Sequence, residues 1–151
     1  MVKESKQWKR GRGKLGMLTP LLGNWQANGD TERGPVSCFR SFTPILNNKF
    51  IQLSARWEFA LGNYEETALL GVNSAGKVAF WSFTSDGKNS AGTLTDVSDI
   101  HPEAIGFEAH MPAGTARMAY WPDEKDGYYW AVEARVKAGW RRFTEHHYRR
   151  V

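Results

Sequence analysis

The side chains best suited to chemistry lie close together near the end of the chain, in the run Thr144-Glu145-His146-His147-Tyr148. Alternate side chains of an extended strand share a face, so His146 is predicted to lie on the same face as Tyr148. Arg142 has the same parity and would add a positive charge to that face. Together these groups could hold the acidic group of a ligand, although a neutral imidazole holds an anion less firmly than a guanidinium does. The same residues could equally be hydrogen-bonded interior side chains with no ligand.

Enzymatic chemistry receives less support from the sequence. The chain contains no glycine-rich phosphate loop, no nucleophile elbow and no His-Glu-x-x-His zinc run. Acid-base chemistry inside the barrel would need a combination of charged and polar side chains, for which the candidates are Arg56, Glu58, Glu66, His146 and Tyr148. However, Arg56 and Glu58 fall on the polar parity of their strand, where charged pairs are usually solvated. An enzyme is therefore a further alternative to a binding protein.

Length and composition predict one modest domain. The chain has 151 residues, of which 41% are hydrophobic, so it can bury a core but is short for two ordinary domains. Cys38 is the only cysteine, which excludes an intramolecular disulfide and a cysteine-type zinc site. No apolar run reaches the length of a signal peptide or a membrane span. The sequence predicts a cytoplasmic protein with no membrane partner.

The basic residues gather at the start of the chain. Residues 1–16 carry six lysines and arginines against Glu4 alone, and the remainder of the chain is close to neutral. We expect a basic, mobile tail over residues 1–16 and a folded domain over residues 17–151. Nucleic-acid binding is not expected, because the folded part shows no basic stripe. Trp8 could instead pin the tail across one end of the domain.

Turn signals recur along the chain at the spacing of a β-meander. Pairs and clusters of Asn, Asp, Ser and Gly separate short apolar segments, and no connection is long enough to hold a crossover helix. An apolar helical turn at residues 17–22 precedes the first segment. The sequence predicts an all-β fold with a single antiparallel closed barrel of about ten strands. After a strand that starts at Gly23, these are residues 36–42, 49–59, 64–72, 77–84, 90–95, 104–111, 115–121, 127–137 and 140–150.

Alternation within these segments predicts which side chains face the interior. In residues 51–59 every second residue is apolar, and the same holds for residues 105–111 and 128–136. Residues 78–83 are apolar on both faces, which favours a covering loop, the N-terminal segment or a homodimer contact there. The inward set is Leu53, Trp57, Phe107, Met118, Tyr120, Trp130 and Val132.

Several short motifs in this order resemble the calycin-type barrels. They are Gly23-x-Trp25 after the helical turn, Gly71-Val72-Asn73 followed by Gly76-Lys77, the turn Ser85-Asp86-Gly87, and the terminal run Glu145-His146-His147-Tyr148-Arg149-Arg150. The resemblance spans nearly the whole chain after residue 17. It is greatest to uncharacterised bacterial lipocalin-like proteins, and it extends more distantly to the nitrobindin and fatty-acid-binding barrels.

A closed barrel brings the last strand beside the first. Arg149 or Arg150 can then lie over the indole of Trp25 and plug one end, an interaction of about 0.5–2 kcal/mol. Gly23 lets the preceding turn pack against the ring. We therefore predict that Gly23, Trp25, Arg149 and Arg150 close the barrel and do not contact a ligand.

The resemblance implies two kinds of ligand. Fatty-acid-binding barrels place a polar residue and a Tyr two positions apart to hold a carboxylate, and His146-x-Tyr148 resembles that pattern with His in place of Arg. Nitrobindin-like barrels bind haem through one histidine near the chain end, which implies His146 or His147 as the alternative haem ligand. Adjacent strand residues point to opposite faces, so the two histidines cannot both bind one metal inside the barrel.

We therefore predict a binder of a small, largely apolar or amphipathic molecule held inside the barrel. No catalytic residue and no bound cofactor are expected, with haem as the alternative. The candidate ligand-binding residues are His146, Tyr148, Arg142, Trp57, Trp130, Tyr120 and Phe107.

Overall fold

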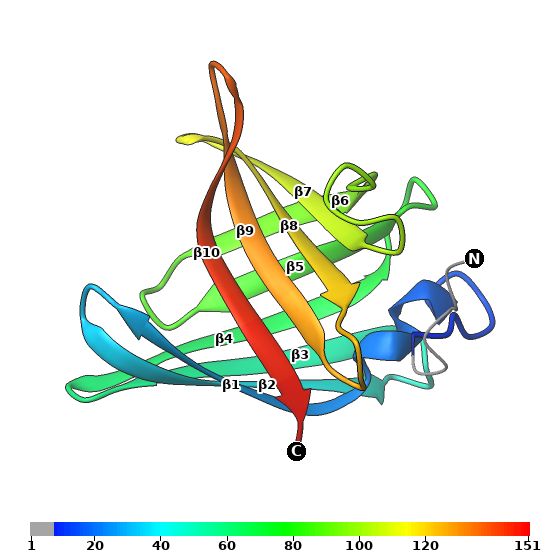
Figure 1. Cartoon of the computed structure of the whole chain (residues 1–151). Coiled ribbons are helices and arrows are strands. Elements are labelled where there is room, and N and C mark those ends of the chain that lie inside the picture. Colours follow the sequence, from blue (N-terminus) through cyan, green and yellow to red (C-terminus); the bar gives the residue numbers. More distant parts are fainter. Residues whose placement is uncertain (1–7) are drawn as a thin grey trace.

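A computed structural model describes residues 8–151 of the chain. In this part of the chain, ten antiparallel strands close into one barrel, and one short 3-10 helix precedes the first strand (Figure 1). This confirms the all-β closed barrel and the N-terminal helical turn predicted from the sequence. The elements are η1 (Gly16–Leu21), β1 (Gly23–Thr31), β2 (Gly34–Ile45), β3 (Phe50–Phe59), β4 (Gly62–Val72), β5 (Val78–Thr84), β6 (Asn89–Thr95), β7 (Ile105–Met111), β8 (Gly114–Pro122), β9 (Tyr128–Val136) and β10 (Gly139–Arg150).

Each strand pairs with its neighbours in sequence, and β10 returns to β1. The closing pair is short, because only Trp25–Arg150 and Gln26–Arg149 are partners between β1 and β10. Beyond these pairs the two strands diverge (Figure 1). The wall at this seam is completed by side chains. The imidazole of His146 lies next to Gly29, where a side chain on β1 would take its space.

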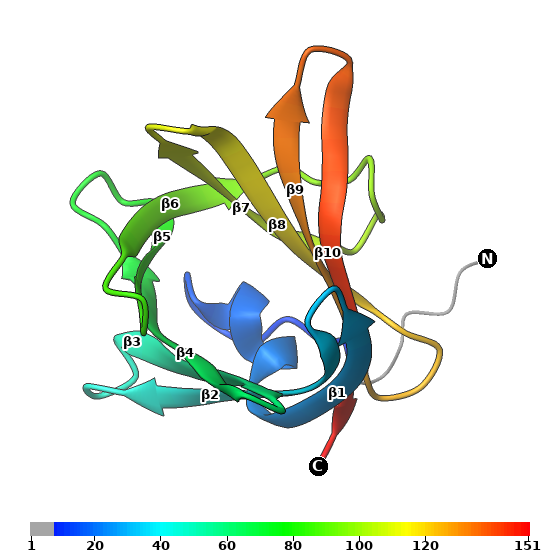
Figure 2. The same ribbon diagram turned by 90° about the vertical axis from the view of Figure 1, so that its left-hand side faces the viewer.

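The two ends of the barrel differ. η1 lies across one end, which we call the capped end. The turns that follow β1, β3, β5, β7 and β9 lie at the other end, which we call the hairpin end. Figure 2 looks into the hairpin end, with η1 behind the ring of strands. None of the helices in residues 8–151 is long and apolar enough to cross a membrane.

Trp25 is the central residue of the capped end. Its side chain is 2% exposed, and its indole Nε1 donates a hydrogen bond of 2.8 Å to the carbonyl of Leu21 in η1. The guanidinium of Arg150 lies 4.2 Å from the centre of the indole ring. Gly23 has a φ of +121°, and a side chain there would collide with the Arg150 guanidinium. Of the two arginines predicted for this role, Arg150 is the one that covers the indole.

The N-terminal segment contacts the barrel from Trp8 onward. The Trp8 indole donates a hydrogen bond of 3.0 Å to the carbonyl of Glu103, and its ring packs against the core beside Tyr128. Lys14 donates a hydrogen bond of 3.0 Å to the carbonyl of Gly76. Within the predicted mobile tail, residues 8–16 therefore lie against the barrel, and residues 1–7 lie outside the described residues.

The outer face of β5 is partly covered by the chain itself. The ring of Phe50 lies over Gly71 on the neighbouring strand and makes a tilted contact with Trp81. Phe83 remains 59% exposed. The homodimer contact predicted for residues 78–83 stays a prediction.

Candidate functional site

A buried arginine lies at the centre of the barrel interior. Strand alternation in β2 turns Cys38, Arg40 and Phe42 inward, and Arg40 is 2% exposed. Its neighbours across the two adjacent strands are Trp25 and Ala55. A cation this far from water is rare unless it is paired.

Aromatic side chains surround the guanidinium of Arg40. Nη2 donates a hydrogen bond of 2.5 Å to the phenol oxygen of Tyr120. The centre of the guanidinium lies 4.7 Å from the centre of the Trp130 ring and 5.8 Å from that of Tyr148. These contacts hold the cation by cation–π attraction and place its N–H donors among phenol groups.

Several polar atoms of this cluster lack partners. Within residues 8–151, the Nε and Nη1 atoms of Arg40 are buried and have no hydrogen-bond partner. The Trp130 indole nitrogen and the hydroxyl groups of Tyr128 and Tyr148 likewise make no full hydrogen bond within these residues, although both phenols lie near Arg40. Buried polar groups are nearly always hydrogen-bonded, because leaving one unpaired costs about 1–3 kcal/mol. A concentration of unmet donors around one cation is typical of a binding site.

One carboxylate faces the same interior. Ala55 is the partner of Arg40 on one side and of Glu66 on the other, so the arginine and the carboxylate are separated by one strand. Glu66 accepts a hydrogen bond of 2.5 Å from the Ser82 hydroxyl. Glu66 and Arg40 are therefore each partly satisfied, Glu66 by Ser82 and Arg40 by Tyr120 through Nη2 alone.

Electrostatics keep the guanidinium charged and the phenols neutral. Burial opposes the charge on Arg40, whereas Glu66 and the phenol oxygens of Tyr120, Tyr148 and Tyr128 favour it, and the pKa of the guanidinium stays raised, so Arg40 is protonated. Burial raises the pKa of the Tyr120, Tyr128 and Tyr148 phenols above their ordinary value. The phenols therefore stay protonated, and their hydroxyl groups can donate hydrogen bonds to an acceptor near Arg40.

His146 forms the edge of the cluster on β10. Its ring stacks on that of Trp130, with centroids 5.9 Å apart, and its Nε2 lies 4.0 Å from the Cys38 sulfur. Burial and the nearby Arg40 charge lower the pKa of His146. Burial also raises the pKa of the Cys38 thiol to about 11. Both side chains are uncharged at neutral pH, so Cys38 is not an activated nucleophile.

Most of the candidate residues predicted from the sequence gather in this interior. Tyr120, Trp130, Tyr148 and His146 surround Arg40, as described above. Trp57 lies towards the hairpin end, where its ring contacts Trp130 at 6.4 Å between centroids. Phe107 is fully buried on the far wall against Phe80. The pairing of β8, β9 and β10 thus brings together residues that are distant in sequence.

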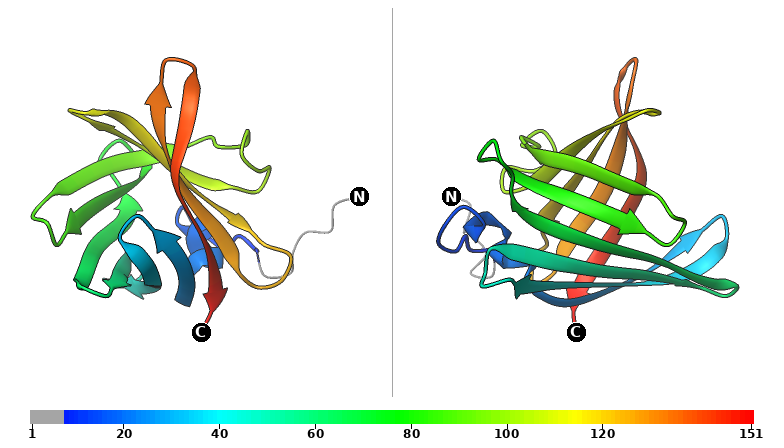
Figure 3. Two further views of the ribbon diagram at one scale, coloured as in Figure 1. Left: turned by 60° about the vertical axis from the view of Figure 1, so that its left-hand side comes forward. Right: turned by 180° about the vertical axis from the view of Figure 1, so that it is seen from behind.

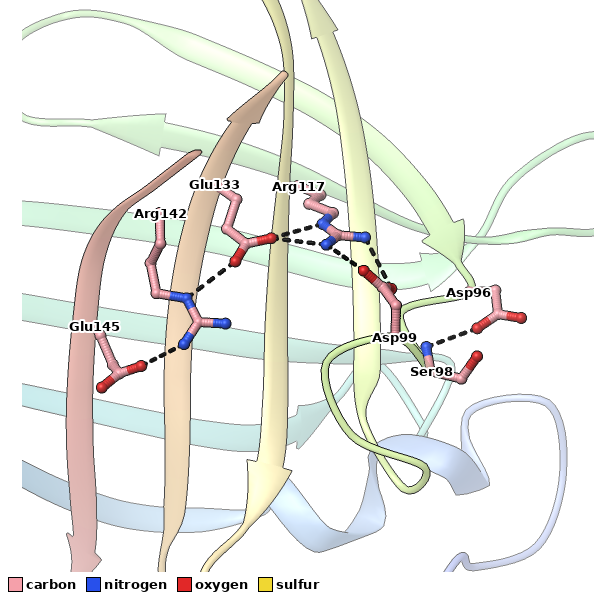
Figure 4. Close-up of polar contacts among 7 residues, drawn as sticks. All are labelled: Asp96, Ser98, Asp99, Arg117, Glu133, Arg142 and Glu145. Carbon is pink, nitrogen blue, oxygen red and sulfur yellow. Dashed lines mark hydrogen bonds and ion pairs between the residues drawn. The ribbon is translucent and has the colours of Figure 1, made fainter. Parts of the chain in front are cut away.

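The predicted inward position of Arg142 is wrong. A β-bulge in β10 between Arg142 and Thr144 adds one residue to the strand. The residues of β10 before the bulge therefore face the opposite side from the one that simple alternation predicts. Arg142 therefore lies opposite Glu133 on the outer face, where its Nε donates a hydrogen bond of 3.0 Å to that carboxylate. Figure 4 shows the resulting chain of ion pairs, which runs from Asp99 through Arg117, Glu133 and Arg142 to Glu145.

Of the two histidines named as the alternative haem ligand, His147 does not face the interior. This residue lies on the outer face, where its Nε2 is 2.8 Å from the Asp123 carboxylate and its ring stacks on Tyr129 at 4.3 Å. His146 is the histidine that faces inward. Its Nε2 is directed at Cys38, and its Nδ1 lies against Gly29 on the barrel wall. The imidazole as placed therefore does not fit axial haem ligation, which needs a ring nitrogen directed into open space.

Arg40 and its relation to Glu66 were missed by the sequence analysis. The signal was present, because Val36, Cys38 and Phe42 set an apolar parity that Arg40 interrupts. A charged residue on the buried parity of a strand indicates a functional site more strongly than an inward aromatic residue does.

Five hollows on the described surface have volumes of about 380–560 Å³. One of these, about 410 Å³ in volume, reaches Arg40 and is lined largely by outward-facing residues of β1 to β4. Within residues 8–151, no cluster of three or more His, Cys, Asp or Glu side chains could hold a metal ion. Comparison with protein-family models and with curated proteins finds no match to this chain. The function is therefore argued from the interior cluster.

Proposed function

We propose that the protein binds a small amphipathic molecule inside the barrel, with an acidic head group against Arg40 and an apolar body among the aromatic side chains. The observation that carries this proposal is a pair of donors on a buried guanidinium, Nε and Nη1 of Arg40, which have no hydrogen-bond partner within residues 8–151. Such a molecule also agrees with the resemblance to lipocalin-like and fatty-acid-binding barrels.

A carboxylate is the acceptor that best matches the hydrogen-bond donors without partners around Arg40. A guanidinium presents its N–H groups as a planar fork, which a carboxylate can accept through two parallel hydrogen bonds. The neutral phenols of Tyr128 and Tyr148 would add donors to the same oxygens. A ligand cation is disfavoured, because the atoms without partners around Arg40 are chiefly donors.

The apolar body of the ligand would point towards the hairpin end. The interior residues Trp57, Phe59 and Tyr64 are only half-buried there, whereas Trp25 and Tyr128 fill the capped end. Binding sites typically join such an apolar wall to a few convergent polar groups. His146 and Tyr148 would lie beside the head group, and Trp130 would lie between head and body.

The test compares two ligands that differ only in the head group. Dodecanoate and dodecanol would compete with a fluorescent apolar probe for the wild-type protein, for Arg40→Met and for Arg56→Met. Arg56 is an exposed cation on the outer face of β3, so it is the matched control. We expect the wild type and Arg56→Met to bind dodecanoate at least tenfold more tightly than dodecanol. Dodecanol cannot make the charge-assisted hydrogen bond to Arg40, which is worth about 1.5–3 kcal/mol.

Arg40→Met should lose this preference and still bind the probe. Tyr148→Phe, which keeps the shape of the ring, should lower the affinity for dodecanoate and leave the affinity for dodecanol unchanged. An unchanged preference in Arg40→Met, or no binding of either compound to the wild type, would contradict the proposal. An enzyme acting on such a molecule remains a further alternative, and the cytoplasmic location stays a prediction.

A further inference from the structure

The hairpin of β9 and β10 extends beyond the rest of the barrel. Figures 1 and 3 show it projecting past the neighbouring turns. We call its outer part, residues 134–143, the β9–β10 finger. It contributes nothing to the cluster around Arg40, because Arg142 and Glu133 lie on the outer face.

The finger exposes apolar side chains. Phe143 is 57% exposed and Val136 is 38% exposed. Phe143 is the residue that the β-bulge leaves without a strand partner, so the bulge directs an aromatic ring into solvent. Met111, in the adjacent β7–β8 hairpin, is 41% exposed. Phe143 and Val136 are thus two exposed apolar side chains on one hairpin, which folding alone does not require.

The finger is also strongly basic. It carries Arg135, Lys137, Arg141 and Arg142 and no carboxylate, whereas the rest of residues 17–151 has a net charge of −5. Arg142 is paired with Glu133 and Glu145, and Arg135 lies over the ring of Trp140. Lys137 and Arg141 are both exposed. The cations thus lie on the same hairpin as the two apolar side chains.

We propose that the β9–β10 finger docks on the surface of a lipid bilayer that contains anionic lipids. The cations would meet the lipid head groups, while Phe143 and Val136 enter the interface, which is the combination that interfacial binding segments use. A nucleic acid would satisfy the cations but not the exposed aliphatic and phenyl groups. Such docking needs no membrane-spanning segment, and it revises the sequence-based expectation of no membrane partner.

The experiment measures sedimentation of the full chain with vesicles, in the absence of any added interior ligand. Its outcome is therefore independent of the function proposed for Arg40. We expect binding to vesicles of phosphatidylcholine with phosphatidylglycerol, and little binding to phosphatidylcholine alone. Lys137→Ser and Arg141→Ser should each weaken binding about fivefold, and Phe143→Ser should weaken it by a similar factor. Added salt should weaken binding further.

The matched control is Leu46→Ser with Lys49→Ser, which removes an exposed leucine and a lysine from the capped end. This variant should bind as the wild type does. A second readout attaches an environment-sensitive dye to Phe143→Cys or to Leu46→Cys, and only the dye at position 143 should brighten on anionic vesicles. Equal loss in the control, equal binding to neutral vesicles, no binding, or tighter binding to duplex DNA than to vesicles would each overturn the proposal.

Discussion

The guanidinium of Arg40 lies 4.7 Å from the ring centre of Trp130, inside a closed barrel and nearly out of reach of water. Cation–π attraction and one hydrogen bond to Tyr120 offset only part of the cost of burying this charge. A residue that destabilises the fold in this way is retained where function requires it.

The first prediction concerns the stability of Arg40→Met. The substitution keeps an unbranched side chain of similar length and removes the buried charge with its unmet donors. We expect the free energy of unfolding in urea to rise by about 1–3 kcal/mol. A loss of stability of that size would show that the guanidinium holds the barrel together and would weaken the case for a binding role.

The second prediction concerns Trp25, the residue that joins η1 to the first and last strands. Trp25→Ala should lower the free energy of unfolding by about 3–5 kcal/mol, because it leaves a cavity and frees the Leu21 carbonyl. Arg150→Ala removes only the exposed cation over the ring and should cost about 0.5–1 kcal/mol. If Trp25→Ala costs less than about 1 kcal/mol, Trp25 does not close the barrel.

The third prediction concerns pH. The pKa of His146 is lowered from its ordinary value of 6.5 by burial and by Arg40, so the unfolded chain takes up a proton more readily than the folded one. This residue should therefore destabilise the fold as the pH falls below about 6.5, and it should have no such effect above neutral pH. Urea denaturation between pH 5 and 8 should show a shallower pH dependence for His146→Gln than for the wild type. The same dependence in both proteins would contradict the burial of the imidazole.

The fourth prediction separates the buried and exposed parts of the ion-pair chain in Figure 4. The side chain of Glu133 is 9% exposed and accepts hydrogen bonds from Arg117 and Arg142, whereas that of Glu145 is 48% exposed. Glu133→Gln should cost about 1–3 kcal/mol of unfolding free energy. Glu145→Gln should cost less than about 1 kcal/mol. Equal costs would show that burial does not set the strength of this network.

The fold could be predicted largely from local signals. Turn residues marked nearly every strand boundary, and alternation placed Leu53, Phe107 and Trp130 on the inner face. The position of Arg142 could not be predicted, because a β-bulge changes parity without leaving a recognisable residue pattern. The site itself depends on β2, β8, β9 and β10 meeting across the barrel, and such contacts between distant segments are not encoded in any single strand. His146 and Tyr148 were found because they share one strand, whereas Arg40 lies on another.

The most direct test of the account observes the Arg40 side chain itself. Nuclear magnetic resonance of the arginine Nε–H groups, assigned with Arg40→Met, would follow the titration of the wild-type protein with dodecanoate and with dodecanol. We predict that dodecanoate moves the Arg40 Nε–H resonance downfield and slows its exchange with water, as expected for a new charge-assisted hydrogen bond. Dodecanol should leave that resonance in place. A dodecanoate response confined to Arg117, Arg142 or other arginines of the outer face, with Arg40 unchanged, would contradict the claim that the barrel interior holds an acidic head group.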